Sequence, residues 1–297
     1  MARSEVVVAD RSPLADADRS GYVPIKSVHV RHWGQLVGAA AVIVLTASVV
    51  LSLLQNEHLD WWVFLANITS EDVLHGLVVT IQLSVISMAL GIVFGTLVAM
   101  MRMSSNRFLS TMAALYVWFF RGIPLIVLVM VWGNFAILAP QLGIGVPFTD
   151  VMFVEAPTNS VLTTFVAACL ALSLHETSYM AEIVRGGILS VNSGQREAAA
   201  ALGLTGGMTM TRVILPQALR VIIPPTGNQF ITLIKSSSLV SVIAGGELMT
   251  AVSDIAASNF RILELLFVAC FWYLVLVTVL SVAQRFFERR LSRGFRR

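Results

Sequence analysis

The sequence predicts an all-α integral membrane protein with six transmembrane helices. Only 12% of its 297 residues are charged and its mean hydropathy is +0.81, whereas roughly a quarter of the residues in a soluble domain carry a charge. The apolar residues gather in runs of about 18 or more, which is the length that a helix needs to cross a bilayer. Short polar segments separate these runs, and lysine and arginine concentrate in alternate segments.

The runs place six multi-pass spans at residues 36–54, 74–101, 109–138, 161–184, 221–244 and 263–283. An even number of spans leaves both termini on one side of the membrane. Nearly all of the 20 lysines and arginines lie outside the spans in residues 1–35, 102–108, 185–220 and 285–297. The opposite loops, residues 55–73, 139–160 and 245–262, hold only Arg261. Because basic segments stay in the cytoplasm, both termini are predicted to be cytoplasmic.

Three regions follow from these spans. Residues 1–35 form a cytoplasmic N-terminal tail, residues 36–285 form the transmembrane domain, and residues 286–297 form a basic cytoplasmic C-terminal tail. The excess of lysine and arginine in the cytoplasmic segments accounts for the pI of about 9.2. The arginines are not interleaved with aromatic residues on a soluble face, so no nucleic-acid partner is expected. The chain has no CxxC pair and no paired histidines, so no metal site is predicted.

The cytoplasmic loop 185–220 contains the passage EAAAALGLTGGMTMTRVILPQALR, which begins at Glu197. Its first eight residues are good helix formers apart from Gly203, and Gly206-Gly207 is expected to stop or bend that helix. A second helical piece should follow and end at Pro216. Two short helices, one of them surfaced with alanine, make a shape that fits a groove on another protein.

At this passage the chain resembles the EAA loop of ABC-importer permeases. The match runs from Glu197-Ala198-Ala199 over three residues to Gly203, and then over nine residues to VILP, where Val213 replaces the usual isoleucine. Four more stretches, YVWFFRGIPLIVL, SYMAEIVRGGI, LPQALRVIIPPTGNQF and LIKSSSLVSVIAGGEL, extend the resemblance to the polar amino acid uptake branch over residues 76–285. The resemblance implies the five-helix core of a type I ABC-importer permease, to which residues 36–54 add an N-terminal helix.

This resemblance implies the membrane subunit of an ATP-driven importer in the bacterial inner (cytoplasmic) membrane. In that family the loop docks into a cleft on a separate ABC ATP-binding subunit. Because these ATPases act as a dimer, a second permease chain, identical or paralogous, is expected, together with an extracytoplasmic substrate-binding protein. The residues expected to couple the loop to the ATPase are Glu197, Ala198, Ala199, Gly203, Arg212, Leu215 and Pro216.

The chain itself is expected to be non-catalytic. It lacks the GxxxxGK[ST] pattern that cradles the phosphates of ATP. ATP and magnesium are therefore expected on the partner ATPase, and no cofactor is expected in this chain. The alternative interpretation of the loop is a long amphipathic connector with no docking role.

Several charged residues fall inside the predicted spans, where a charge must face the protein interior, water or an opposite charge. Arg121 lies about 18 Å along the third span, and Gly122 and Pro124 beside it predict a break in the helix. Arg121 could bind a substrate carboxylate or form a structural ion pair with Glu176 or Glu182.

The fourth and fifth spans carry the other polar candidates for a substrate path. Glu176, Tyr179 and Glu182 recur at intervals of three and should share one helix face. Glu176 could pair with a substrate ammonium group, or the face could form a hydrogen-bond network between helices. In the fifth span, a polar path could be lined by Lys235, Ser236 and Ser237. Lys235 could instead snorkel or pair with Glu247, and Pro224-Pro225 should kink the same span.

Two alternatives to the importer come from other classes. A secondary transporter or channel could use Arg121, Glu176 and Lys235 as an ion relay, but it predicts paired inverted repeats, and the sequence shows no convincing repeat. A membrane enzyme would need a nucleophile with a base or a metal, and the spans offer no such set. Arg121 and Glu176 together suit the two charges of an amino acid, and Glu176 favours a cationic or neutral polar side chain.

Overall fold

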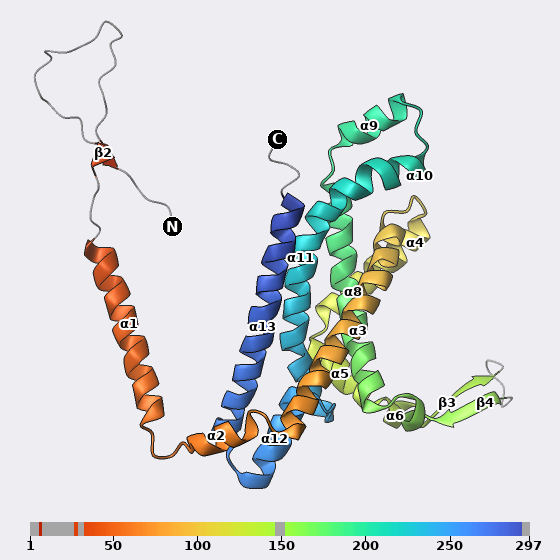
Figure 1. The fold of residues 1–297 in the computed structure, drawn as a ribbon. Helices are drawn as coiled ribbons and strands as arrows, with labels where there is room; N and C mark the ends of the chain where they lie inside the picture. Colours follow the sequence, from red (N-terminus) through yellow and green to blue (C-terminus); the bar gives the residue numbers. More distant parts are fainter. Residues whose placement is uncertain (1–5, 8–26, 29–32, 146–151, 293–297) are drawn as a thin grey trace, which may run out of the picture. The chain divides into compact units, whose positions relative to one another are not determined.

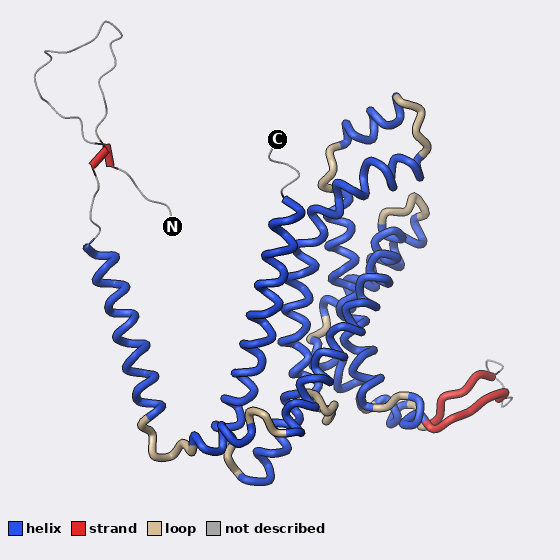
Figure 2. The backbone as a smooth tube through the Cα atoms, in the orientation of Figure 1, coloured by secondary structure: helices blue, strands red, loops and turns tan. Residues whose placement is uncertain are grey.

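The computed structural model describes residues 6–7, 27–28, 33–145 and 152–292, which are mostly helical (Figures 1 and 2). The chain divides into two compact units, Met1–Leu59 and Asp60–Arg297. The first unit holds a short antiparallel pair, β1 (Val6–Val7) and β2 (Ser27–Val28), and the helix α1 (Trp33–Leu54). Most of the predicted tail, residues 1–35, lies outside the described residues. The helix predicted at 36–54 is present as α1.

The second unit is a bundle of long helices joined by shorter elements. Its elements are α2 (Trp61–Asn67), α3 (Glu71–Arg102), α4 (Arg107–Gly122), α5 (Leu125–Gly133), α6 (Phe135–Leu138), β3 (Gln141–Gly145), β4 (Met152–Pro157), α7 (Thr158–Val161), α8 (Thr164–Leu189), α9 (Ser193–Ala201), α10 (Gly206–Thr209), the π-helix η1 (Met210–Ile214), α11 (Leu215–Ser236), the 3-10 helix η2 (Ser237–Ile243), α12 (Leu248–Asn259) and α13 (Ile262–Ser292).

The long helices of this unit run alongside one another between two ends (Figure 1). We call the end that carries α9 and α10 the loop end, and the end that carries α12 and the β3–β4 hairpin the hairpin end. Helices α3, α8 and α13 run toward the loop end, and α11 returns from it (Figure 1). Helix α8 contacts α3, α4, α5 and α11, so it is the central helix of the bundle.

Among the described residues, three helices can cross a membrane by length and composition, namely α1 over Val37–Leu54, α3 and α13. Two bent pairs raise the number to five: α4 with α5, bent by 96°, and the helix Gly206–Ile243 with α12, bent by 45°. The span predicted at 161–184 is helical as α8 but is not among these five, so six apolar spans are not confirmed. Polar residues such as His175 and Glu176 reduce its hydropathy, and the helices packed around α8 shield them from lipid.

The predicted break in the third span is confirmed. Helix α4 ends at Gly122, Pro124 precedes α5, and the two helices meet at 96°. A proline in this position cannot donate a backbone hydrogen bond to the preceding turn. The span predicted at 109–138 is therefore not one straight helix but consists of α4, α5 and the short α6, and α4 with α5 can still form one bent span. Helix α11 continues as one helix through Pro224 and Pro225, and the kink expected there stays a prediction.

The segments predicted as outer loops contain ordered elements. Residues 245–262 hold α12, because Leu248, Val252 and Ala256 recur at helical spacing and are buried against α3 and α13. Within residues 139–160, the strands β3 and β4 pair antiparallel, with Leu142 opposite Ala156. The loop predicted at 55–73 contains α2. Elements of this kind are amphipathic and too short to be detected in a hydropathy profile.

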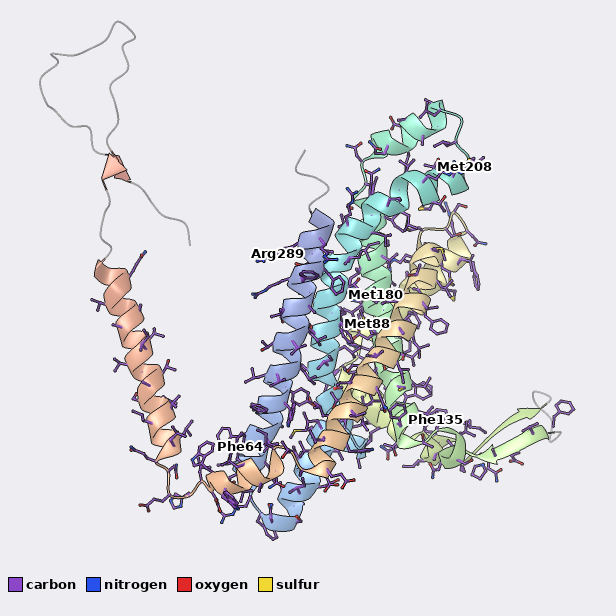
Figure 3. All side chains as sticks on the ribbon, viewed as in Figure 1. Phe64, Met88, Phe135, Met180, Met208 and Arg289 are labelled. Carbon is purple, nitrogen blue, oxygen red and sulfur yellow. The ribbon has the colours of Figure 1, made fainter. Side chains whose placement is uncertain are left out.

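The core of the bundle lies between α3 and α8. Met180 of α8 is buried within it (Figure 3). A methyl group at Gly95 of α3 would lie 2.6 Å from Cβ of Met180, and one at Gly91 would lie 2.8 Å from Cβ of Glu176. Both distances are too short for a real contact, so only glycine permits this approach of the two helices. This close packing fixes the position of α8 and its polar residues.

Candidate functional site

The first candidate site is the loop between α8 and α11, which projects from the loop end of the bundle (Figure 1). Its first arm is α9, which begins at Asn192, whose side chain accepts a hydrogen bond from the N–H of Gly194 at 2.8 Å. The arm ends at Gly203, which has a φ of +73°. The N–H of Leu204 donates to the carbonyl of Ala199 at 3.0 Å, and the N–H of Gly203 donates to that of Ala200 at 2.9 Å. This pair of bonds is the Schellman helix ending, which requires the left-handed conformation that glycine adopts without strain.

The surface of α9 is small, smooth and accessible. Glu197 and Ala198 are exposed, while Ala199 is 3% exposed and attaches the helix to the rest of the loop. Leu202, directly before Gly203, is 80% exposed. A large apolar side chain that projects from the tip of a protein indicates a contact surface. Sequence reasoning did not single out Leu202, although its place next to the helix-ending glycine was a usable signal.

The second arm is a continuous helix, so the end predicted at Pro216 is wrong. The helix begins at Gly206-Gly207, two residues that were expected to stop or bend a helix, and continues through α10 and η1 into α11. Within η1 the backbone widens, and the N–H of Leu215 donates to the carbonyl of Met210, five residues earlier. This π turn removes the clash that the ring of Pro216 would otherwise make with the carbonyl four residues before it.

The second arm is anchored on one face and open on the other. Ile214 is 1% exposed and packs into the core with Ala218 and Ile222, and sequence reasoning had not selected it as an anchor. Arg212 and Pro216 are exposed, and Leu215 is 37% exposed. Met208 marks the outer part of this arm (Figure 3). The residues expected to couple to an ATPase therefore lie on one loop and, apart from Ala199, are accessible.

The second candidate site surrounds Glu176 in the middle of α8. Glu176 is 1% exposed, and its Oε1 accepts a hydrogen bond from Nε2 of Gln229 on α11 at 3.2 Å. Its Oε2 is buried and has no hydrogen-bond partner among the described residues. A buried carboxylate oxygen is costly unless it accepts a hydrogen bond, so Oε2 is the acceptor that this site offers to a further donor. Gln229, which lies in the polar run TGNQF of α11, was not singled out from the sequence.

Arg121 approaches the same region from α4. Its guanidinium carbon lies 4.9 Å from the centre of the Tyr179 ring, which is a cation–π contact. Tyr179 follows Glu176 by one helical turn and also packs against the ring of His175, with a centroid distance of 4.8 Å. Among the described residues Arg121 forms no ion pair with Glu176 or Glu182. The structure thus brings Arg121, which is exposed, against Tyr179, while Glu176, one turn earlier on α8, faces Gln229 of α11.

Glu182 belongs to a separate group at the loop end. Its Oε2 accepts hydrogen bonds from Nε and Nη2 of Arg185 at 3.1 and 2.7 Å, and its Oε1 lies 3.5 Å from Nη1 of Arg102 at the end of α3. The predicted common face of α8 therefore meets three different helices: Glu176 meets α11, Tyr179 meets α4, and Glu182 meets α3. This arrangement joins α8 to its neighbours at three levels.

Lys235 and Ser236 end α11, and Ser237 begins η2. Lys235 is exposed, and the buried hydroxyl of Ser237 donates to the carbonyl of Ile234 at 2.7 Å. The suggested pair between Lys235 and Glu247 is not present. Glu247 instead caps α12, where its carboxylate accepts from the N–H groups of Met249 and Thr250 at 2.6 and 2.9 Å.

The comparison with known proteins agrees with this arrangement. Residues 91–293 match the family described as "Binding-protein-dependent transport system inner membrane component". The chain is 41% identical over 273 residues to the arginine transport system permease protein ArgU of Corynebacterium glutamicum, which covers 91% of this chain and 84% of that protein. It is 36% identical over 219 residues to the glutamine transport system permease protein GlnP of Escherichia coli K12, covering 74% and 92% of the two chains.

Solved structures show the same fold. A chain from the crystal structure of an amino acid ABC transporter with histidines superposes with a TM-score of 0.63 and is 32% identical, covering 74% of this chain and 94% of that one. A chain of the MetNI methionine ABC transporter in an inward-facing conformation gives a TM-score of 0.60 at 21% identity, with 75% and 99% covered.

Proposed function

The chain belongs to the family of binding-protein-dependent transport system inner membrane components and is the membrane subunit of an ABC importer for amino acids; we propose that it imports polar amino acids. Curated relatives that are named for arginine and glutamine transport support the polar class. The observation that supports a role in an ATP-driven importer is the loop of α9, Gly203 and η1. This loop is accessible, and it is attached to the core.

The proposed orientation places the loop end in the cytoplasm of a bacterial cell, with both termini on that side. The distribution of lysine and arginine supports this orientation. In this arrangement α8 is a sixth span: its 26 residues reach about 39 Å, which exceeds the thickness of the hydrocarbon core. Its polar residues are tolerated because other helices surround it.

The loop 197–216 is proposed to dock on a separate ATPase subunit, which binds ATP and magnesium and acts as a dimer. Glu197 offers a charge to a basic partner, the alanines of α9 allow a close approach, and Leu202 supplies an apolar contact. A second permease chain and an extracytoplasmic substrate-binding protein complete the proposed assembly. The loop is proposed to transmit movements of the ATPase to the bundle, because α11 starts in the loop and enters the bundle.

The proposed substrate path passes Arg121, Tyr179 and Glu176. The guanidinium of Arg121 suits the carboxylate of an amino acid, and the unpartnered Oε2 of Glu176 suits an ammonium or guanidinium group. Lys235, Ser236 and Ser237 would belong to a separate stretch of the path at the hairpin end. Glu182 is proposed to have a structural role, because its two oxygens already face Arg185 and Arg102.

Reconstitution tests the proposal. The chain, its ATPase and its binding protein are assembled in liposomes, and uptake of labelled arginine and glutamine is measured with and without ATP and with a proton uncoupler. We expect uptake that requires ATP and the ATPase and is unchanged by the uncoupler. Uptake that needs no ATPase, or that the uncoupler abolishes, would instead establish an ion-coupled transporter or channel.

A charge reversal tests the docking role of the loop in the same assay. Glu197→Lys should reduce both ATPase association and uptake while the chain remains in the membrane. Glu57→Lys is the matched control, because Glu57 is exposed and lies outside the loop. Equal association and uptake for the two variants would show that the loop is only a connector.

A further inference from the structure

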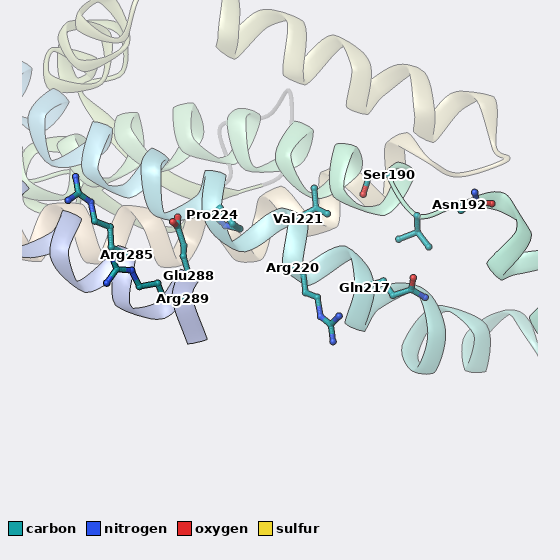
Figure 4. A pocket seen from close by; sticks show the side chains of 10 residues that line it. Ser190, Asn192, Gln217, Arg220, Val221, Pro224, Arg285, Glu288 and Arg289 are labelled. Carbon is teal, nitrogen blue, oxygen red and sulfur yellow. The ribbon is translucent and has the colours of Figure 1, made fainter. Parts of the chain in front are cut away.

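A basic cavity of about 720 Å³ opens at the loop end of the bundle (Figure 4). Arg220 of α11 and Arg285 and Arg289 of α13 contribute to its lining, as does the segment after α8. Glu288 also lines it, and the Oε1 of this carboxylate accepts a hydrogen bond from Nε2 of Gln284 at 2.7 Å. Among the described lining residues, three guanidinium groups accompany one carboxylate, and an excess of positive charge favours an anionic ligand.

A second cavity, of about 510 Å³, lies beside the first between α3, α11 and α13. Glu288 lines both cavities, so they adjoin at the last turns of α13. Apart from a few polar groups, the lining of the second cavity is aliphatic or aromatic, with contributions from Ile92, Ile223, Phe230, Leu280 and Phe287. It lies along helices that have the length and composition of membrane spans.

These two cavities together match one molecule that has an anionic head and apolar tails. The apolar cavity lies beside the hydrophobic part of α13, where an acyl chain is available and a water-soluble partner is not. The basic cavity lies at the end of that helix, where the proposed orientation puts the headgroups of the cytoplasmic leaflet. Basic pockets between membrane helices bind anionic headgroups by this combination of contacts.

We propose that the groove between α3, α11 and α13 binds an anionic phospholipid, with its phosphate at Arg220, Arg285 and Arg289 and an acyl chain in the apolar cavity. The guanidinium groups bind phosphate oxygens through charge-assisted hydrogen bonds. Because α11 continues from the coupling loop, the lipid would contact the segment that joins this loop to the bundle. This site is distinct from the Arg121, Tyr179 and Glu176 group.

Native mass spectrometry of the assembled transporter tests the proposal. The complex is incubated with vesicles of phosphatidylglycerol or phosphatidylcholine, and the retained lipid is counted. We expect phosphatidylglycerol to be retained in preference to phosphatidylcholine. Arg285→Gln and Arg289→Gln should each lower the affinity for phosphatidylglycerol about fivefold, and Glu288→Gln should raise it. Equal retention of the two lipids by the wild type would overturn the proposal.

Arg290→Gln is the matched control for charge. Its guanidinium lies 4.4 Å from the centre of the Phe286 ring, and Arg290 is not among the residues that line either cavity. The control should retain the lipid like the wild type. A loss equal to that of Arg285→Gln would mean that any positive charge near this end suffices, and would overturn the assignment of this groove.

A second pair of variants tests the apolar half without changing charge. Ala283→Phe fills the apolar cavity, whereas Val282→Phe adds the same ring on a neighbouring residue that lies outside it and is 60% exposed. Only Ala283→Phe should reduce retention. Displacement of phosphatidylglycerol by glycerol phosphate at equal concentration would show a site for a free phosphate ester. Loss of lipid whenever the ATPase is bound would show that the ATPase occupies the groove. Either result would refute the proposal.

Discussion

Replacing Gly203 tests whether the backbone ending of α9 matters for docking. Gly203 has a φ of +73°, and a methyl group there would meet no described atom within 4 Å. Gly203→Ala therefore introduces no clash, and its only direct cost is the left-handed conformation, about 1–2 kcal/mol for a residue with a Cβ. A cost of this size reduces the population of the observed loop conformation about 5- to 30-fold.

If the ATPase recognises this conformation, the dissociation constant of the ATPase for the reconstituted chain should rise by the same factor. The assay is binding of labelled ATPase to the chain in nanodiscs, followed by ATP-dependent uptake. Gly203→Asn should cost less than Gly203→Ala, because asparagine tolerates the left-handed region better.

Gly207→Ala is the control for the loss of a glycine within the same loop. Gly207 lies in α10, and a methyl group there would also meet no atom within 4 Å. Alanine favours a helix by about 1 kcal/mol over glycine, so this variant should bind the ATPase at least as well as the wild type. Equal weakening by Gly203→Ala and Gly207→Ala would refute the backbone explanation, as would asparagine being worse than alanine at position 203.

Three further predictions follow from packing and polar contacts. Gly95→Ala should destabilise the chain by about 1–3 kcal/mol, seen as a lower melting temperature, because the methyl group meets Met180; Gly186→Ala, which has open space, should not. Glu247→Ala should cost about 1–2 kcal/mol by uncapping α12, and hydrogen exchange should rise in that helix; unchanged exchange would contradict the capping role. Glu176→Gln should raise KM for arginine more than for glutamine, and equal changes would remove Glu176 from substrate selection.

The sequence was most informative where one residue type dictates the backbone. The break between α4 and α5 follows from Gly122 and Pro124 and was predicted. The helix in the coupling passage was predicted from its alanines, and the structure places its end at Gly203. The long apolar helices α1, α3 and α13 were predicted from hydropathy alone, since burial in lipid requires a continuous apolar run.

The sequence was least informative where tertiary contacts override local preference. A proline usually ends a helix, but the π turn before Pro216 lets the helix continue. Residues 245–262 looked like a loop because α12 is short, and its stability comes from contacts with α3 and α13. Gln229 could not be selected as the partner of Glu176, because no local pattern connects residues on α8 and α11.

The continuous helix from Gly206 connects the two candidate sites. Over residues 206–236 it extends about 46 Å at 1.5 Å per residue, beginning in the coupling loop and carrying Gln229 on its way through the bundle. Glu176 is fixed on α8 by the close packing against Gly91. A displacement of the loop along the axis of α11 must therefore either move Gln229 relative to Glu176 or bend α11 between them. Since the hydrogen bond is 3.2 Å long, a shift of one or two ångströms suffices to break it and to leave both oxygens of Glu176 able to accept from another donor.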